Sequence, residues 1–228
     1  MPMKDLDLVI LDMAGTTIVD AGQVPEAFST VLGAYGIEVT QEALRSVRGA
    51  SKREAIRHFV ERKLPGDARE IKIRAEQIFS AFREHLAEKY TEGGVSSILG
   101  AVETFAWLRG QGIKVALNTG FDRIITTLLL QAIGWNKDTV DAVICGDDVP
   151  QGRPAPYLIF RAMETTGTIS VHRVANVGDT VLDLQAGFHA GVRWNIGVLS
   201  GAHTKEQLEK VPFTYLIPSV ADIPDLWK

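Results

Sequence analysis

Leu8-Val9-Ile10-Leu11-Asp12-Met13-Ala14-Gly15-Thr16-Thr17 is the stretch that decides the fold of this chain. Its first four residues are all apolar, and such an unbroken run is typical of a strand that is buried on both faces. We therefore predict a strand over residues 6–11, with Asp12 at its end and a glycine–threonine turn after it. Because α/β proteins bind ligands outside the carboxyl ends of parallel strands, the stretch predicts an α/β fold with a polar site at that edge.

Five further segments are predicted to be strands, and helices lie between them. The predicted strands cover residues 113–118, 140–145, 174–177, 194–198 and 215–217. The predicted helices cover residues 102–111, 123–132, 155–166 and 181–190. Strands that alternate with helices of about 10–15 residues are typical of a parallel sheet, so we expect a Rossmann-like α/β core.

The segment from about residue 20 to 95 has a different character. It has no convincing strand, and it has four amphipathic patterns, over residues 25–35, 41–47, 52–62 and 68–90. Since the segment lies between the first and second predicted strands, we interpret it as a helical insertion into the core. The predicted domains are an α/β core of residues 1–18 and 96–228 and a helical cap of residues 19–95.

Composition excludes several classes of protein. The 228 residues are 46% hydrophobic and 23% charged, which is the balance of a globular chain with a full core. A net charge of −4 provides no basic field for nucleic acid or an anionic membrane, and one cysteine, Cys145, excludes an internal disulfide. No apolar stretch approaches the ~20 residues of a membrane span, and acids interrupt the first apolar run. We expect a soluble, cytoplasmic protein.

Polar residues follow four of the predicted strands. They are Asp12, Thr119-Gly120, Asp147-Asp148, and Asp179 with Asp183. One aspartate in such a place is most often a solvated loop residue, but an ordered set on successive strand ends favours a functional site. Carboxylates gathered at one edge repel one another unless a cation lies among them, and hard oxygen ligands favour Mg²⁺.

Four segments resemble, in order, the four sequence motifs of the haloacid dehalogenase (HAD) superfamily. They are LVILDMAGTT, ALNTG, GRPAPYLIF and VGDTVLD, in which the first begins at Leu8. The resemblance covers essentially the whole chain, with the helical insertion as a C1-type cap. It implies an Mg²⁺-dependent hydrolase that acts on a small organophosphorus compound through an aspartyl-phosphate.

The resemblance also implies roles at the phosphoryl group. Asp12 is the nucleophile; it is already a carboxylate and needs no base to attack phosphorus. Thr119 and the amide of Gly120 hold phosphate oxygens. Arg153 supplies the positive charge that most members take from a lysine. This agrees with general chemistry, because phosphoryl transfer depends on positioning and on neutralising negative charge.

The resemblance places the metal beside the nucleophile. Asp12, the backbone carbonyl of Ala14 and Asp179 are the implied Mg²⁺ ligands, and Asp183 completes or orients the site. Ala14 is itself a departure, because most HAD phosphatases have there a second aspartate that protonates the leaving oxygen. Alanine cannot move a proton.

Phosphonoacetaldehyde hydrolases, the phosphonatase family, have the same departure. They read Asp-x-Ala-Gly-Thr-Thr and cleave a carbon–phosphorus bond. In that family a cap lysine forms an imine with the substrate aldehyde, and the imine accepts the electrons of the broken bond. The chain resembles this family in its third and fourth motifs as well. We therefore expect cleavage of phosphonoacetaldehyde or a close analogue.

Lys52 is the candidate for the imine-forming residue. It follows Gly49 by three residues, as the lysine does in that family. Ser51 and Glu54 form the Ser-x-x-Glu pattern of a capping box, which predicts Lys52 at the first position of a helix. The helix dipole and the neighbouring arginines are expected to lower the pKa of Lys52 and favour the nucleophilic amine.

The cap residues also allow alternatives to the hypothesis of carbon–phosphorus cleavage. Arg48 and Ala55 stand where phosphonatases have a methionine and a histidine, so the substrate could be another phosphonate or a phosphate. A phosphatase or phosphomutase resembling β-phosphoglucomutase would use Lys52 only to bind phosphate. Loss of Asp12 or Asp179 would indicate a silent binding protein, and both are present. The expected partner is a small organophosphorus molecule, with a possible homodimer formed through the cap.

Overall fold

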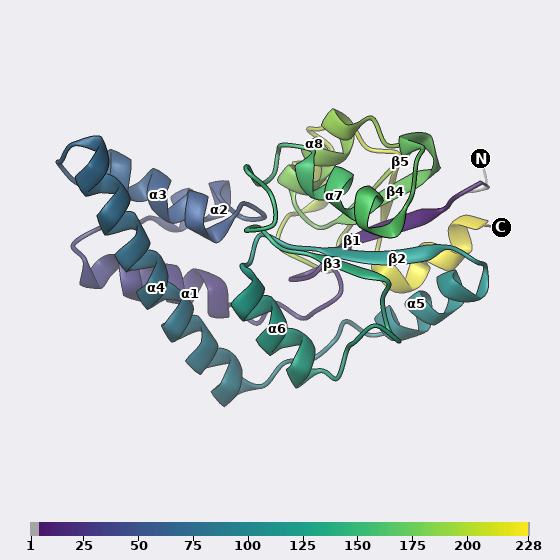
Figure 1. Ribbon diagram of the computed structural model, residues 1–228, viewed down its shortest axis with the longest axis horizontal. Coiled ribbons are helices and arrows are strands. Elements are labelled where there is room, and N and C mark those ends of the chain that lie inside the picture. Colours follow the sequence, from purple (N-terminus) through teal and green to yellow (C-terminus); the bar gives the residue numbers. More distant parts are fainter. Residues whose placement is uncertain (1–4, 228) are drawn as a thin grey trace.

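One six-stranded parallel sheet forms the centre of the computed structural model, which describes residues 5–227 (Figure 1). Its strands are β1 (Leu8–Asp12), β2 (Lys114–Asn118), β3 (Ala142–Ile144), β4 (Val174–Gly178), β5 (Trp194–Val198) and β6 (Tyr215–Ile217). Their order is β3-β2-β1-β4-β5-β6, and each neighbouring pair is parallel. The predicted α/β fold is therefore confirmed.

Helices cover both faces of this sheet, which explains the apolar run in β1. Helices α7 (Tyr157–Thr166) and α8 (Val181–Ala190) pack on one face, together with Leu8 and Ile10 of β1. Helix α5 (Ala101–Gly110) and the 3₁₀ helix η2 (Val220–Trp227) pack on the other face, where Val9 and Leu11 point. The remaining helices of this part are α6 (Arg123–Ala132), η1 (Val171–Arg173) and α9 (Lys205–Leu208).

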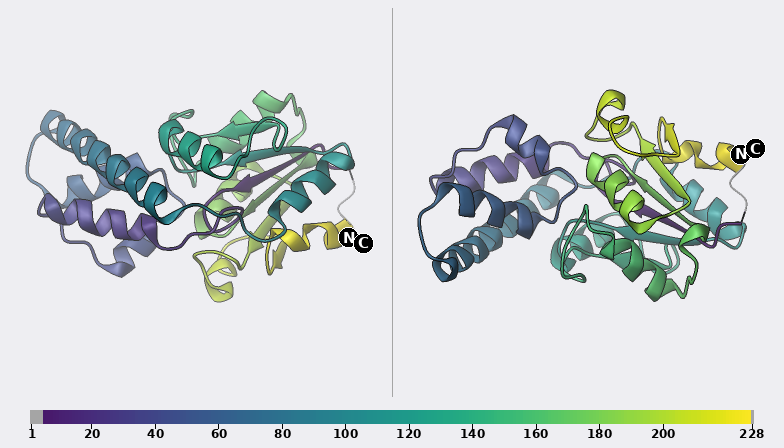
Figure 2. Two further views of the ribbon diagram at one scale, coloured as in Figure 1. Left: turned by 90° about the horizontal axis from the view of Figure 1, so that it is seen from below. Right: turned by 90° about the horizontal axis from the view of Figure 1, so that it is seen from above.

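Four helices follow β1 in the chain before the sheet continues. They are α1 (Gln23–Ala34), α2 (Gln41–Ser46), α3 (Lys52–Lys63) and α4 (Ala68–Gly93). The long helix α4 packs against α1 and α3 around the aromatic rings of Phe28, Phe59 and Phe82. Both views of Figure 2 place these helices together, beyond the carboxyl ends of the strands. The helical insertion predicted from the sequence is thus present as four helices.

The two segments that connect these helices to the sheet lie side by side. Ile18 forms an antiparallel bridge with Ser97, and the amide of Val19 donates to the carbonyl of Ser96 over 3.0 Å. The amide of Ile98 donates in turn to the carbonyl of Thr17 over 2.9 Å. The chain therefore leaves the core and returns to it at one place, next to the loop that follows Asp12.

The order of the strands fixes where a ligand can bind. β1 lies between β2 and β4, at the point where the strand order reverses, and ligands of such sheets bind at that point. Asp12 pairs in register with Asn118 of β2, and its predecessor Leu11 pairs with Val177 of β4. The residues after these three strands consequently meet at one edge, which faces the four helices.

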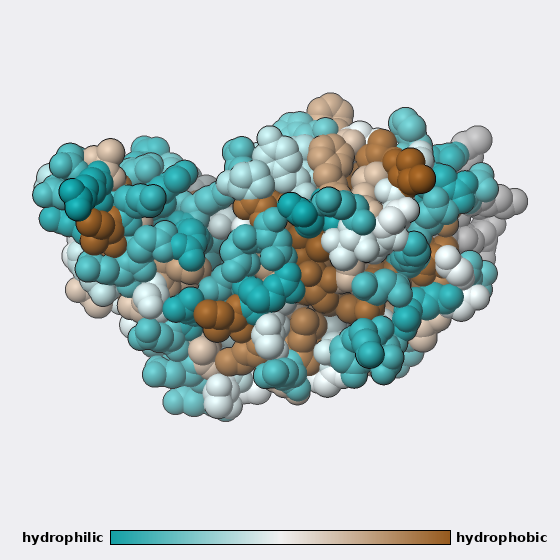
Figure 3. Space-filling model, viewed as in Figure 1, coloured by the Kyte–Doolittle hydropathy of each residue, from teal (hydrophilic) through white to brown (hydrophobic). Residues whose placement is uncertain are grey.

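The surface view supports two separate lobes. Figure 3 shows polar side chains over much of the visible face, with a hollow between the lobe of α2 and α3 and the lobe of α7 and α8. Among the helices that the structure describes, none is both long and apolar enough to cross a bilayer. Association of two chains through α1–α4 stays a prediction.

Candidate active site

Three buried aspartates meet at the edge of the sheet. Asp12 ends β1, Asp179 follows β4, and Asp183 lies in the first turn of α8, where Thr180 caps the helix. One carboxylate oxygen from each of the three lies within 4.8 Å of the others. Asp179 is oriented by the Thr16 hydroxyl, which donates over 3.1 Å. The acids expected at the strand ends thus form one cluster.

Gly15 explains part of the first motif. Its φ of +89° belongs to the left-handed region, which side chains other than glycine rarely adopt. A Cβ atom at this position would lie 2.5 Å from Oδ2 of Asp179. Glycine is therefore required here both for the turn after Asp12 and for the close approach of Asp179.

Arg153 is buried between two of these acids. Its Nη1 lies 2.8 Å from Oδ1 of Asp12, and its Nε lies 2.9 Å from Oδ1 of Asp183. The same guanidinium donates to Oδ1 of Asn118 over 2.5 Å and to the carbonyl of Gly49 over 3.2 Å. A buried arginine requires such partners, and the planar fork matches them. The guanidinium is held directly beside the expected nucleophile.

The acids carry more negative charge than one arginine balances. The pKa of Asp12 is raised to about 6, mainly by burial; Arg153 opposes this shift and the charge of Asp183 adds to it. Burial also raises the pKa of Asp179 to about 8, with contributions from Asp12 and Asp183. A divalent cation among the carboxylates would remove this penalty, because it supplies the missing positive charge. The donor set therefore fits Mg²⁺.

The three acids differ in the oxygen atoms that they leave for a metal. Both oxygens of Asp183 have partners in the protein, since Oδ1 meets Arg153 and Oδ2 accepts from the amide and hydroxyl of Thr180 over 3.0 and 2.5 Å. Asp12 meets Arg153 through Oδ1. These contacts suit an orienting role for Asp183 and a direct role for Asp12. Asp179 accepts from the Thr16 hydroxyl through Oδ1 and from the amide of Ala202 through Oδ2 over 2.6 Å, so a metal would share these oxygens with the protein.

Thr119 and Gly120 lie at the carboxyl end of β2 and line the same pocket as Asp12. The cap touches the core here: the amide of Lys52 donates to the carbonyl of Gly120 over 3.0 Å. A Cβ atom at Gly120 would lie 2.3 Å from the carbonyl oxygen of Ala50. Glycine at this position consequently allows the loop before α3 to approach the carboxyl end of β2.

Lys52 begins α3 and extends into this pocket. It is only 9% exposed, and its Nζ donates to the carbonyl of Ala50 over 3.2 Å and lies 4.9 Å from the centre of the Phe121 ring. Burial lowers the pKa of Lys52 to about 8; Asp12 opposes this shift and Arg153 adds to it. The direction agrees with the sequence prediction, but the main cause is burial.

One of the neighbouring arginines that were expected to lower this pKa lies away from Lys52. Arg53 points to the outer side of α3, where it pairs with Glu76 and lies over the ring of Phe79. The predicted capping box is only half formed. The Ser51 hydroxyl accepts from the amide of Glu54 over 3.5 Å, but the Glu54 carboxylate accepts from the amide of Gly152 over 2.8 Å. Glu54 thus joins the cap to the loop that carries Arg153.

Two other acids from the sequence analysis lie outside the cluster. Asp147 accepts from the backbone amide of Arg123, and Asp148 pairs with the Arg123 guanidinium. They therefore stabilise the start of α6 and lie outside the cluster of Asp12, Asp179 and Asp183. Cys145 is buried, and burial raises the pKa of its thiol to about 12, as suits a core residue.

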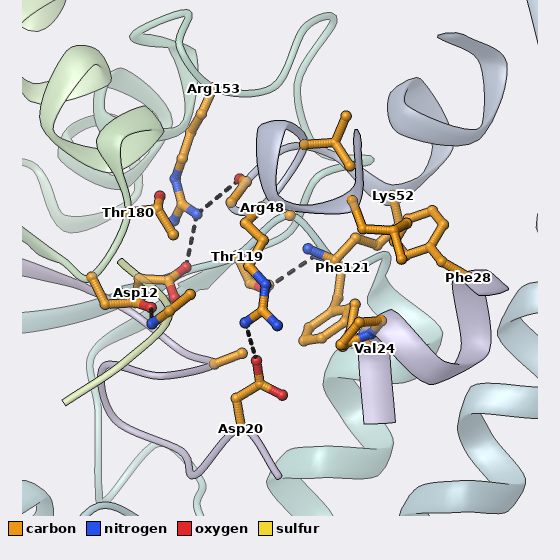
Figure 4. Close-up of a pocket in the computed structure, with 18 residues that line it drawn as sticks. Asp12, Asp20, Val24, Phe28, Arg48, Lys52, Thr119, Phe121, Arg153 and Thr180 are labelled. Atoms are coloured by element: carbon orange, nitrogen blue, oxygen red, sulfur yellow. Dashed lines mark hydrogen bonds and ion pairs between the residues drawn. The ribbon is translucent and has the colours of Figure 1, made fainter. Parts of the chain in front are cut away.

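The pocket contains an ion pair whose acid, Asp20, the sequence analysis did not name. Arg48 and Asp20 line it together with Asp12, Lys52 and Phe121, and Arg48 Nη1 lies 2.9 Å from Oδ2 of Asp20 (Figure 4). The position of Arg48, directly before the loop that leads to Lys52, was the available signal. The cavity volume is about 40 Å³, enough for roughly three water molecules, which favours a small substrate.

Comparison with known proteins identifies the class of this fold and site. The model of the haloacid dehalogenase-like hydrolase family matches residues 6–191. The chain belongs to this family, and it is a hydrolase.

Within the family the chain is similar to phosphonoacetaldehyde hydrolases. That of Parabacteroides distasonis is 30% identical over 214 residues, which are 88% of this chain and 79% of that protein. The solved structure of a phosphonoacetaldehyde hydrolase-like protein from Oleispira antarctica has a TM-score of 0.82 at 25% identity, and the match covers 99% of this chain and 94% of that one. The resemblance found in the sequence is therefore confirmed.

The fold alone is shared more widely. A putative β-phosphoglucomutase from Bacteroides vulgatus has a TM-score of 0.79 at 20% identity, and the match covers 98% of this chain and 88% of that one. At this identity the likeness shows a common architecture. It does not separate the two functions that the sequence left open, and that decision rests on the chemistry of the pocket.

Proposed function

We propose that this enzyme cleaves the carbon–phosphorus bond of phosphonoacetaldehyde or a close analogue. One observation carries the proposal: a buried lysine of the cap, Lys52, shares a pocket with Asp12, while position 14 holds an alanine. A phosphomonoesterase needs an acid for its leaving oxygen, and Ala14 supplies none. A carbon leaving group needs an acceptor for an electron pair, and an imine on Lys52 supplies one.

The first step is formation of the imine. Neutral Nζ of Lys52 adds to the aldehyde carbon, and loss of water gives a protonated C=N bond. Burial favours this step, because it lowers the pKa of Lys52 to about 8 and so raises the share of neutral amine near neutral pH. The ring of Phe121, 4.9 Å from Nζ, excludes water from one side of the amine.

The second step breaks the carbon–phosphorus bond. A carboxylate oxygen of Asp12 attacks phosphorus, and the electron pair of the P–C bond forms a C=C bond while the C=N electrons move to nitrogen. The products are an aspartyl-phosphate and an enamine. A proton from water restores the imine, and one water molecule then releases acetaldehyde and free Lys52. A second water molecule releases phosphate and restores Asp12.

The core residues hold the phosphoryl group during these steps. Arg153 places positive charge 2.8 Å from Asp12, which lets an anionic nucleophile approach an anionic phosphonate. Thr119 and Gly120 line the same end of the pocket and are suited to bind phosphonate oxygens. Asp12, Asp179 and the carbonyl of Ala14 would hold Mg²⁺. When bound, the metal supplies charge neutralisation at the phosphoryl oxygens.

Borohydride trapping tests the imine directly. The protein is mixed with phosphonoacetaldehyde and sodium borohydride, digested, and analysed by mass spectrometry. We expect a reduced two-carbon adduct on the peptide that contains Lys52. The matched control is Lys63→Arg, which alters an exposed lysine at the other end of α3 and should leave the adduct unchanged.

Lys52→Arg separates this proposal from the alternative, a phosphatase or phosphomutase. An arginine retains the charge and binds phosphate well, but it forms no productive imine. We expect the variant to lose at least about a thousandfold in the rate of phosphate release from phosphonoacetaldehyde. If no adduct forms and Lys52→Arg remains active on a panel of phosphomonoesters, carbon–phosphorus cleavage is wrong and the alternative function stands.

A further inference from the structure

The pair of Arg48 and Asp20 has no role in the steps described above, although it lines the reaction pocket. Arg48 precedes the loop that leads to Lys52, and Asp20 lies in the segment that leads from β1 to α1. Figure 4 shows the Arg48 guanidinium between Asp12 and Phe121, with Asp20 below it. Arg48 thus lines the same small pocket as Asp12 and Lys52.

Asp20 holds the Arg48 guanidinium in place through one nitrogen atom and leaves its other N–H donors available. Oδ1 of Asp20 accepts from the amide of Gly22 over 3.0 Å, and Oδ2 accepts from Nη1 of Arg48 over 2.9 Å. Within residues 5–227, Asp20 is the side chain with which Arg48 forms a hydrogen bond or ion pair. A guanidinium has five N–H donors, so most donors of Arg48 have no partner among residues 5–227. The Arg48 side chain is 28% exposed, which leaves room for a ligand.

A second arginine in the same pocket, Arg153, shows that one guanidinium can bind two carboxylates. Arg153 lies between two carboxylates, Asp12 at 2.8 Å and Asp183 at 2.9 Å. Arg48 has one carboxylate, Asp20, on one edge. A planar fork that is held by one acid is positioned to bind a second acid through its other edge, and the bidentate pair of arginine with carboxylate is the strongest form of this contact.

The remaining walls beside Lys52 are apolar. Val24, Phe28 and Phe121 lie there in Figure 4, with Pro25, Leu44 and Val47 also lining the pocket. These side chains offer no partner to a polar group on the carbon end of the substrate. A charged group at that end consequently has one complementary cation besides Lys52 and Arg153, and that cation is Arg48.

We propose that Arg48 binds a carboxylate on the carbon end of the substrate, so that the preferred substrate is a β-oxo phosphonate with a carboxylate next to its carbonyl. The inference rests on the proposed function, because the carbonyl reacts with Lys52 and the phosphorus with Asp12 as before. For 3-phosphono-2-oxopropanoate the balance is one water consumed overall, with cleavage of the P–C bond to phosphate and 2-oxopropanoate. Arg48 is a specificity-determining residue, and Asp20 is its positioning residue.

The test compares two substrates with one variant. Phosphate release and the organic product are measured for phosphonoacetaldehyde and for 3-phosphono-2-oxopropanoate. We expect kcat/KM of the wild-type enzyme to be at least about tenfold higher for the carboxylated compound, since a site built for a charged group discriminates against its absence. Arg48→Met should lose at least about a hundredfold on the carboxylated compound, and its loss on the aldehyde should be at least about tenfold smaller than that.

Arg53→Met is the matched control. It makes the same exchange five residues along the chain, where the arginine faces outward and pairs with Glu76. We expect it to change neither kcat/KM by more than about twofold. Circular dichroism and thermal unfolding of both variants separate loss of specificity from loss of fold, and Arg48→Lys, which keeps the charge without the fork, should lie between wild type and Arg48→Met.

The possible outcomes distinguish the inference from the function on which it rests. A wild-type preference for the aldehyde, with Arg48→Met equally impaired on both compounds, overturns the carboxylate site while carbon–phosphorus cleavage stands. Phosphate release from neither compound, together with no borohydride adduct on Lys52, overturns the proposed function and the inference with it. A preference that reverses in Arg48→Met, but not in Arg53→Met, supports both the carboxylate site and the proposed function.

Discussion

The two walls of the pocket differ in how firmly their polar side chains are held. On the core wall, Arg153 contacts Asp12, Asp183 and Asn118, and these contacts fix all its nitrogen atoms. On the cap wall, Lys52 makes one hydrogen bond and Arg48 one ion pair. The side chains of the core wall are therefore held in one arrangement, whereas those of the cap wall can change without disturbing the rest.

The difference separates chemistry from substrate choice. Phosphoryl transfer requires donors and charges in fixed places, because the catalytic effect comes from positions prepared in advance. Recognition of the carbon end requires only that a few side chains complement it. We therefore expect changes on the core wall to reduce all turnover, and changes on the cap wall to reduce it less or to redirect it. The following predictions run from the largest expected effect to the smallest.

Asp12→Asn should have the largest effect. The amide is nearly isosteric with the carboxylate but does not attack phosphorus, so we expect phosphate release to fall by at least about ten-thousandfold. Arg153 keeps its ion pair with Asp183, which should preserve the fold. Steady-state assays and the thermal unfolding midpoint measure the two properties. Activity in this variant above that of a mock preparation would contradict the covalent mechanism.

Removal of the metal should have the second-largest effect on activity. EDTA is expected to lower phosphate release at least about a hundredfold, because several kcal/mol of charge stabilisation at the phosphoryl group are lost. Added Mg²⁺ should restore the rate. Asp179→Asn should need more Mg²⁺ for half-maximal activity than the wild-type enzyme. A rate that survives EDTA would show that the three acids serve another purpose.

The pH dependence tests the cap wall. In the proposed mechanism neutral Lys52 adds to the substrate carbonyl, so kcat/KM should rise with pH by about tenfold per unit below pH 8 and level off above it, given the lowered pKa of about 8. A lysine with its ordinary pKa of 10.5 would extend the rise beyond pH 10. Asp20 raises the pKa of Lys52, so Asp20→Asn should move the rise to lower pH. If Asp20→Asn leaves the pH profile unchanged, the ionisation that the profile reports belongs to the substrate and not to Lys52.

The smallest expected effect concerns the contact between the walls. Glu54→Ala removes the acceptor for the amide of Gly152, a half-buried hydrogen bond. We expect KM to rise about threefold to tenfold, which corresponds to a net hydrogen-bond energy of about 0.5–1.5 kcal/mol. Glu54→Gln retains an oxygen acceptor and should lose less. Glu61→Ala, which alters an exposed acid of the same helix, is the control and should leave KM unchanged.

Sequence predicted the core wall better than the cap wall for a physical reason. Asp12, Thr119 and Asp179 directly follow buried strands, and parallel strands place such residues at one edge whatever the loops do. The apolar runs that mark these strands are local, so the sheet could also be predicted. Of the core contacts, the two ion pairs of Arg153 were not evident, since they join residues that are more than 25 positions apart.

The cap wall depends on contacts between distant segments. The local pattern predicted that Glu54 forms a capping box with Ser51. In the folded chain the Glu54 carboxylate instead accepts from the amide of Gly152, which is distant in the sequence. The lowered pKa of Lys52 was predicted, whereas its main cause, burial under Phe121 and its neighbours, is a property of the assembled pocket. Asp20 and Arg48 are 28 positions apart, and only the folded structure brings them together.

The paired connecting segments at Ile18 and Ser97 also bear on how such enzymes diversify. An insertion whose two ends lie next to each other can be exchanged as a unit, because the host needs no change in the path of its own chain. Evolution can therefore replace the helices between these segments and retain the sheet with its acids. Grafting these helices from a relative onto this core, with joins at the two paired segments, is the corresponding route for protein engineers to new organophosphorus substrates.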